Sequence, residues 1–176
     1  MSYYIHNTDS SGFGFSGSEK EIMGFMDHVA NELSERRIKA CASEEALVAT
    51  SPTSYVAEME RLRDAVLSAK EFEEKKKALR PLLDKADYPF DISIGYGEVS
   101  IEYDLGGHDY WRDEDEAEEF LSAIAPYLKK GSWIGLVGED LSIWSYVFDG
   151  KGGFETVGGS INWTGRPYAD EGGDAR

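Results

Sequence analysis

The spacing of apolar residues changes once along this chain, and the change separates a helical part from a β-rich part. From Ser18 to Ala86 apolar residues recur mainly at the 3.6-residue period of an amphipathic helix. After Asp87-Tyr88-Pro89 they alternate with polar residues at a period of two, which is typical of half-buried strands. This order predicts an α+β fold in which helices pack on an antiparallel β-sheet.

The N-terminal part is predicted to hold short extended segments followed by a helix. Residues 3–5 are expected to form a strand, and 13–15 a second extended piece. Ser18 and Glu21 have the spacing of a capping box, in which each residue satisfies the other's backbone amide. A helix is therefore expected to begin at this point.

The helical region has two alternative arrangements. After Ile38 the apolar pattern weakens, and only a short helix is expected at 43–49. The apolar stripe over 54–86 predicts either one long helix kinked near Pro81 or a helical hairpin that turns near Lys70.

The C-terminal half predicts the element order ββαβββ. The expected strands are 90–96, 99–105, 133–137, 141–148 and 154–163, with a helix from 113 to about 130. Gly97-Glu98 is expected to turn the first hairpin, and Gly158-Gly159 to form a bulge. Pro126 is expected to kink the helix or end it early, and Gly131 to cap it.

The length allows one ordinary hydrophobic core, so 1–176 is interpreted as a single α+β domain. Its expected parts are an N-terminal strand and helix (1–53), a helical arm or hairpin (54–87), an antiparallel sheet with one helix (88–163) and a flexible tail (164–176).

Charge is concentrated in one quarter of the chain. The net charge is -16, of which -8 falls in residues 88–130, whereas residues 54–87 are neutral overall. A surface this acidic repels nucleic acid and anionic membranes and favours basic partners. The basic run Lys75-Lys76-Lys77 is therefore interpreted as a solvent-exposed helix face rather than a nucleic-acid patch.

Several features favour the cytoplasm. Cys41 is the only cysteine, so the chain cannot form an internal disulfide, which fits a reducing compartment. The first ten residues lack the basic start and apolar run of a signal peptide, and no apolar run is long enough to span a bilayer.

Motifs for cofactors and catalysis are weak. Gly12, Gly14 and Gly17 spell G-x-G-x-x-G, but they do not directly follow a strand, and Phe13 and Phe15 would crowd a phosphate. We therefore interpret this segment as an aromatic loop and expect no bound cofactor.

Metal binding and catalysis are also not expected. His108 with Asp104 and Asp109 is the best metal-ligand group, and Asp113-x-Asp115 resembles the start of a calcium loop that lacks the later ligands. No nucleophile motif surrounds Cys41. The sequence therefore predicts a protein that is not an enzyme.

Trp144, Tyr146 and Phe148 share one face of a predicted strand. The simpler interpretation is a sheet face covered by helices. The alternative is an aromatic recognition patch, because aromatic residues are enriched in interface cores.

The acidic residues around the predicted helix start are the main functional signal. Acids at a helix N-terminus are favourable, but six within seven residues repel one another, so capping does not explain them all. The predicted partner-binding residues are Glu102, Asp104, Asp109, Glu114, Asp115, Glu118 and Glu119, with Tyr103, Tyr110 and Trp111 as aromatic anchors.

The sequence thus favours a non-catalytic acidic inhibitor that docks on a basic surface of another protein, one that itself binds nucleic acid. It would act as DNA-mimicking anti-CRISPR and anti-restriction proteins of phages do, by analogy of charge and size. One alternative is an immunity protein that neutralises a basic toxin. Another is a small enzyme or ligand-binding domain with a pocket between sheet and helices. Oligomeric state and strand order are left open.

Overall fold

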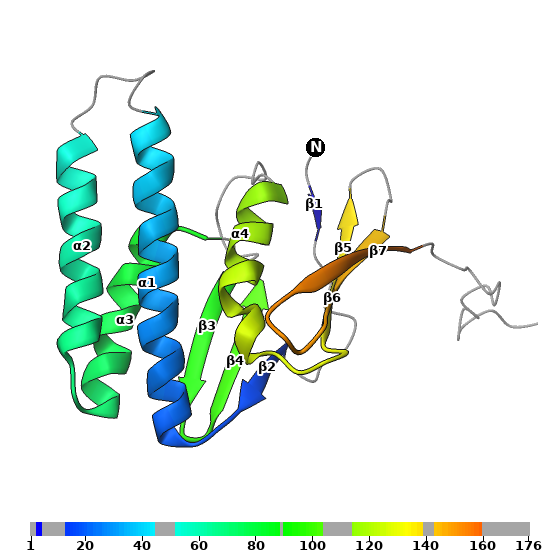
Figure 1. Cartoon of the computed structure of the whole chain (residues 1–176), viewed down its shortest axis with the longest axis horizontal. Coiled ribbons are helices and arrows are strands. Elements are labelled where there is room, and N and C mark those ends of the chain that lie inside the picture. Colours follow the sequence, from blue (N-terminus) through cyan, green and yellow to red (C-terminus); the bar gives the residue numbers. More distant parts are fainter. Residues whose placement is uncertain are drawn as a thin grey trace, which may run out of the picture.

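The α+β class and the ββαβββ order of the C-terminal half are confirmed (Figure 1). The computed structural model describes residues 3–4, 13–44, 52–88, 90–103, 114–138 and 143–159. The helices are α1 (Glu19–Glu44), α2 (Pro52–Ser68), α3 (Phe72–Ala86), α4 (Glu114–Ile124) and a short 3-10 helix (Ala125–Tyr127). The strands are β1 (Tyr3–Tyr4), β2 (Phe13–Ser16), β3 (Phe90–Gly95), β4 (Glu98–Tyr103), β5 (Trp133–Gly138), β6 (Ile143–Phe148) and β7 (Phe154–Gly159).

The strands form two antiparallel sheets rather than one. A three-stranded sheet has the order β2-β4-β3, and a four-stranded sheet has the order β1-β5-β6-β7. Each sheet recruits one N-terminal strand, since Phe13 pairs with Ile101 and Tyr3 pairs with Gly138. The two-residue period identified the strands, but it carries no information about which strands become neighbours.

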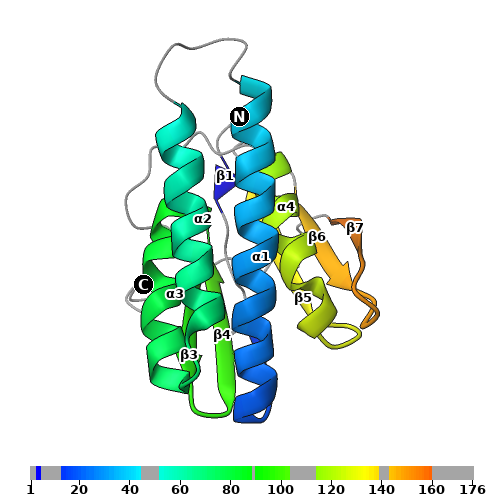
Figure 2. The ribbon, with the colours of Figure 1, turned by 60° about the vertical axis from the view of Figure 1, so that its left-hand side comes forward.

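The region 54–86 is a helical hairpin, as one of the two alternatives predicted. α2 ends at Ser68 and α3 begins at Phe72. Helices α1, α2 and α3 stand side by side, and α4 packs beside α1 on the side of the four-stranded sheet (Figures 1 and 2). α1 continues to Glu44, beyond the predicted weakening after Ile38, and most of the short helix expected at 43–49 lies outside the described residues.

The predicted capping box at the start of α1 is confirmed. The Glu21 carboxylate accepts hydrogen bonds from the Ser18 backbone amide at 2.7 Å and from the Ser18 hydroxyl at 2.6 Å. In return the Glu21 amide donates to the Ser18 hydroxyl oxygen at 3.3 Å. These bonds lower the pKa of the Glu21 carboxyl, because they stabilise its charged form.

Aromatic side chains join α4 to the three-stranded sheet and pack together within the four-stranded sheet. The Phe90 ring of β3 stacks on the Phe120 ring of α4, with centroids 4.5 Å apart. Tyr146 and Phe148 of β6 are buried, and both contact the Phe154 ring edge-on. Tyr146 and Phe148 therefore form part of the hydrophobic core and are not an exposed recognition patch.

Lys75 corrects the prediction of a solvent-exposed basic run. Its side chain is 3% exposed, and its ammonium group forms an ion pair with Asp27 of α1. The same group donates to the Val66 carbonyl near the end of α2, at 2.7 Å. A buried ammonium group needs such partners, because desolvation of an unpaired charge is costly. Lys75 thus connects all three helices of this part of the chain.

Several predicted turns and ends also differ in detail. The β3–β4 turn lies at Tyr96-Gly97, one residue earlier than expected. The helix ends at Ile124, before Pro126, as predicted, so Gly131 does not cap it. Gly158 and Gly159 pair regularly with β6, so no bulge interrupts β7 there. Residues 160–176, with the predicted tail, lie outside the described part of the chain.

Candidate functional site

The outward face of the three-stranded sheet is the described surface that best matches the predicted acidic binding face. Side chains alternate along a strand, so Val99 and Ile101 of β4 are buried against the helices while their neighbours lie on the opposite face. We call this opposite surface the acidic sheet face; its residues are Gly14, Ser16, Asp91, Ser93, Gly95, Glu98, Ser100 and Glu102. Small side chains and carboxylates alone make up this face.

Two carboxylates of the acidic sheet face lie directly opposite each other. Asp91 of β3 pairs in register with Glu102 of β4, an arrangement that is unfavourable for like charges. Arg80 of α3 compensates, because its guanidinium lies 2.6 Å from Asp91 and 2.9 Å from Asp84. The negative charges of Asp91 and then Asp84 raise the pKa of Arg80. Glu98 and Glu102 are exposed and form no ion pair with a described residue.

Gly14 lets the strands of this sheet approach each other. A Cβ atom at this position would lie 1.9 Å from the Val99 carbonyl oxygen, which no side chain can tolerate. Gly17 follows β2, and its amide donates to the Gly97 carbonyl at 3.1 Å. These two glycines of the G-x-G-x-x-G motif therefore serve strand packing and a turn, and Gly12 lies outside the described residues.

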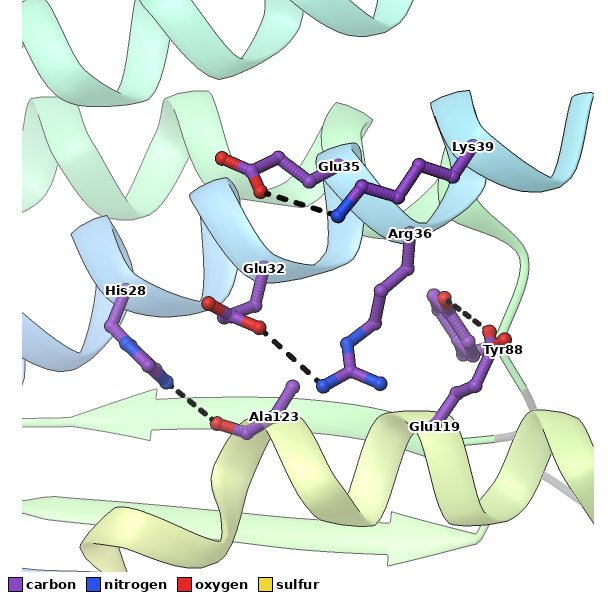
Figure 3. Close-up of polar contacts among 8 residues, drawn as sticks. All are labelled: His28, Glu32, Glu35, Arg36, Lys39, Tyr88, Glu119 and Ala123. Atoms are coloured by element: carbon purple, nitrogen blue, oxygen red, sulfur yellow. Dashed lines mark hydrogen bonds and ion pairs between the residues drawn. The ribbon is translucent and has the colours of Figure 1, made fainter. Parts of the chain in front are cut away.

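Glu119 belongs to a group of polar contacts where α1 and α4 lie side by side (Figure 3). Its carboxylate accepts a hydrogen bond from the Tyr88 hydroxyl at 3.2 Å. The Arg37 guanidinium lies over the Tyr88 ring, 4.2 Å from its centroid. Burial raises the pKa of Tyr88, and the charge of Glu119 acts in the same direction. Glu119 is thus partly engaged inside the molecule.

Two further polar contacts of α1 lie beside α4. The His28 ring nitrogen Nε2 lies 2.8 Å from the Ala123 carbonyl oxygen at the end of α4. Arg36 forms an ion pair with Glu32 at 3.4 Å, and Figure 3 shows its side chain extending toward α4. The ion pair lies within α1, so it is the His28 contact that attaches the end of α4 to α1.

The structure describes some of the predicted partner-binding residues and not others. Glu102 lies on the acidic sheet face, and Glu118 of α4 is partly exposed. Tyr103 ends β4 opposite Phe90, and Glu114 and Asp115 begin α4. Asp104, Asp109, Tyr110 and Trp111 lie outside the described residues, as does His108 of the suggested metal group. Figure 1 shows β4 running toward the end of the molecule where α4 begins.

Two acids of the acidic sheet face were missing from the predicted set. Asp91 and Glu98 belong to the same alternating pattern that identified Glu102, so the period of two was the signal. Applied to both strands of the hairpin, that pattern would have placed all three on one face.

Metal binding and membrane insertion can be checked directly on the described residues. No three described metal-ligand side chains lie close enough together to hold an ion. None of the described helices is both long and apolar enough to cross a membrane.

Comparison with known proteins provides no relative for this chain. No protein-family model, no curated protein and no solved structure matches it. A functional proposal must therefore come from the chain's own residues.

Proposed function

We propose that this protein is a non-catalytic acidic inhibitor that docks on a basic surface of another protein, one that itself binds nucleic acid. The observation that carries the proposal is the acidic sheet face. It combines exposed Glu98 and Glu102 with serine and glycine, and neither glutamate forms an ion pair with a described residue.

Charge supports the same function. A net charge of -16, with -8 in residues 88–130, produces a field that attracts basic proteins and accelerates their encounter. The acidic start of α4 follows β4 in the chain, and Glu114, Asp115 and Glu118 add to the negative charge of residues 88–130. A partner that normally grips phosphates would meet carboxylates in their place.

The proposal is tested by capture followed by quantitative binding. The tagged protein is used to capture partners from the cells in which it occurs, and the dominant basic partner is purified. Association rates are then measured at about 50 and about 200 mM salt for the wild type and for E98Q/E102Q. The matched control is E60Q/E74Q, which removes two exposed charges from α2 and α3.

We expect association to slow about tenfold with the added salt, and by a similar factor in E98Q/E102Q at low salt. The control should change the rate less than about threefold, because its charges lie away from the acidic sheet face. Displacement of the partner from a DNA duplex would support inhibition at a nucleic-acid site. A salt-independent rate, or equal effects of the two double variants, would refute the proposal.

A further inference from the structure

A groove of about 410 Å³ lies between α3 and β3 and adjoins the acidic sheet face at Ser93. Figures 1 and 2 both place α3 beside β3. Its apolar lining includes Leu79 and Leu83 from α3 and Ile92 and Ile94 from β3, while Lys76 and Lys77 stand at its α3 side. The groove thus has apolar residues from both elements and two lysines on its α3 side.

On the β3 side of this groove lies a sheet edge with which no described strand pairs. β3 is the outer strand in the order β2-β4-β3, and Gly95 pairs with Glu98 across a two-residue turn. In such a hairpin the pair beside the turn is hydrogen-bonded, and hydrogen-bonded pairs then alternate along the strands. Ile92 and Ile94 therefore direct their amides and carbonyls toward the open edge, where no described residue bonds to them.

The two lysines of the groove are available to bind a ligand. Lys76 and Lys77 form no ion pair with a described residue, whereas the neighbouring Arg80 is held by Asp84 and Asp91. The charged side chains that line the groove are Glu73, Lys76, Lys77 and Arg80, one acid and three bases. On a chain of net charge -16, this local excess of positive charge favours anionic side chains.

We propose that this groove binds an extended, acidic segment of another protein, which adds to β3 as a further strand. The free edge supplies backbone hydrogen bonds, as in other cases of β-strand addition. Alternate side chains of the segment point in opposite directions. One set packs on Leu79 and Leu83, and the acidic side chains reach Lys76 and Lys77.

This surface differs from the proposed inhibitor face in the sign of its charge, although Ser93 borders both and Arg80 of the groove binds Asp91 of the acidic sheet face. The variants that test the two surfaces, K76E/K77E and E98Q/E102Q, change no residue in common. A single protein could therefore hold a basic partner on the acidic sheet face and an acidic segment beside β3. Failure of one binding mode leaves the other intact, so the two proposals are separately testable.

The test uses a capped, fluorescent peptide of alternating valine and glutamate, with binding followed by anisotropy. A peptide with lysine in place of glutamate tests charge. A peptide with alternate amides N-methylated tests strand addition, since it keeps the charge but removes hydrogen-bond donors. The variant is K76E/K77E, and K129E/K130E is its control, because Lys129 and Lys130 are also adjacent and exposed.

We expect the valine–glutamate peptide to bind, and the lysine and N-methylated peptides to bind at least about tenfold more weakly. K76E/K77E should lose about tenfold or more in affinity and K129E/K130E less than about threefold. In the wild-type protein, the amides of Ile92 and Ile94 should exchange with solvent about tenfold more slowly when the peptide is bound.

Three results would overturn the proposal. The first is equal binding by the N-methylated peptide, which would mean that no strand is added. The second is an equal loss in both lysine double variants, which would reduce the effect to net charge. The third is protection of Ile92 and Ile94 in a dimer without peptide, which would assign the edge to a second copy of this chain.

Discussion

Replacing Asp27 of α1 by asparagine should destabilise the protein, because Asp27 is the counter-charge of a buried lysine on α3. Lys75 of α3 is almost fully buried, and its ammonium group contacts the Asp27 carboxylate and the Val66 carbonyl. Asparagine keeps the shape of Asp27 and removes its charge. The ammonium group would then remain buried without a counter-charge.

The expected cost follows from the exposure of the two partners. Removing one member of a fully buried ion pair costs about 3–5 kcal/mol. The Asp27 side chain is 42% exposed, so water screens part of this interaction. We therefore expect about 2 kcal/mol for Asp27→Asn, or a melting temperature lower by about 4–8 °C.

Lys75→Met should cost less than Asp27→Asn. Methionine fills the volume of the lysine stem without a charge to desolvate. The Val66 carbonyl still accepts a hydrogen bond from the Ala69 amide, at 3.3 Å. We expect a loss of about 1 kcal/mol or less, and the double variant should be no less stable than Asp27→Asn alone.

Urea unfolding at neutral pH, followed by circular dichroism, measures these differences. Glu35→Gln is the control, since it removes a charge from the same helix at a more exposed pair with Lys39 and should cost less than about 0.5 kcal/mol. The reasoning is wrong if Asp27→Asn matches this control. It is also wrong if the effects of Asp27→Asn and Lys75→Met simply add.

Three further predictions concern single positions. Gly14→Ala should lower the free energy of unfolding by roughly 3 kcal/mol, since the added Cβ would lie 1.9 Å from a carbonyl oxygen. By contrast, a Cβ added at Gly24 would meet no described neighbour within 4 Å, so Gly24→Ala should stabilise α1 by up to about 1 kcal/mol. Urea unfolding measures both effects. Ser18→Ala should cost about 1 kcal/mol at neutral pH. Because the folded-state pKa of Glu21 lies below 4.5, the stabilisation from its cap is present above that pH and is lost on acidification, so melting curves of Ser18→Ala and wild type should converge in acid. Tyr88→Phe should cost about 1 kcal/mol through its lost hydrogen bond to α4. Burial raises the pKa of Tyr88 above its usual 10.0, so the wild type should lose stability as the pH rises beyond 10 and the variant should lose less; unchanged alkaline melting curves would contradict this.

Local features of the fold were predictable from the sequence. The cap formed by Ser18 and Glu21 depends on residues three apart, and the β3–β4 hairpin depends on alternation around one glycine turn. Such patterns need no knowledge of the rest of the chain.

Features that depend on distant residues were not predicted. Positions 72, 75, 79, 82 and 86 form one buried row on α3, so helical spacing alone could have placed Lys75 inside. Its partner Asp27 lies 48 residues away, and no spacing rule identifies it. Division into two sheets likewise depends on where β1 and β2 pair.

Prediction of the candidate site was limited in the same way, by contacts between distant parts of the chain. Glu102 was predicted because its own strand alternates, but the groove needs α3 to lie against β3. The contact between Arg80 and Asp91 joins those two elements and could not be inferred from either one.

The pairing of the first strands has a consequence for synthesis on the ribosome. β2 pairs with residues 98–101 and β1 with 137–138, so neither has its partner until most of the chain has been made. At a translation rate of about 5–20 residues per second, β1 waits for roughly 7–27 seconds. During that interval α1, α2 and α3 are already complete and can pack together. β1 is therefore among the last of the described segments to be placed, although it leaves the ribosome before the strand with which it pairs.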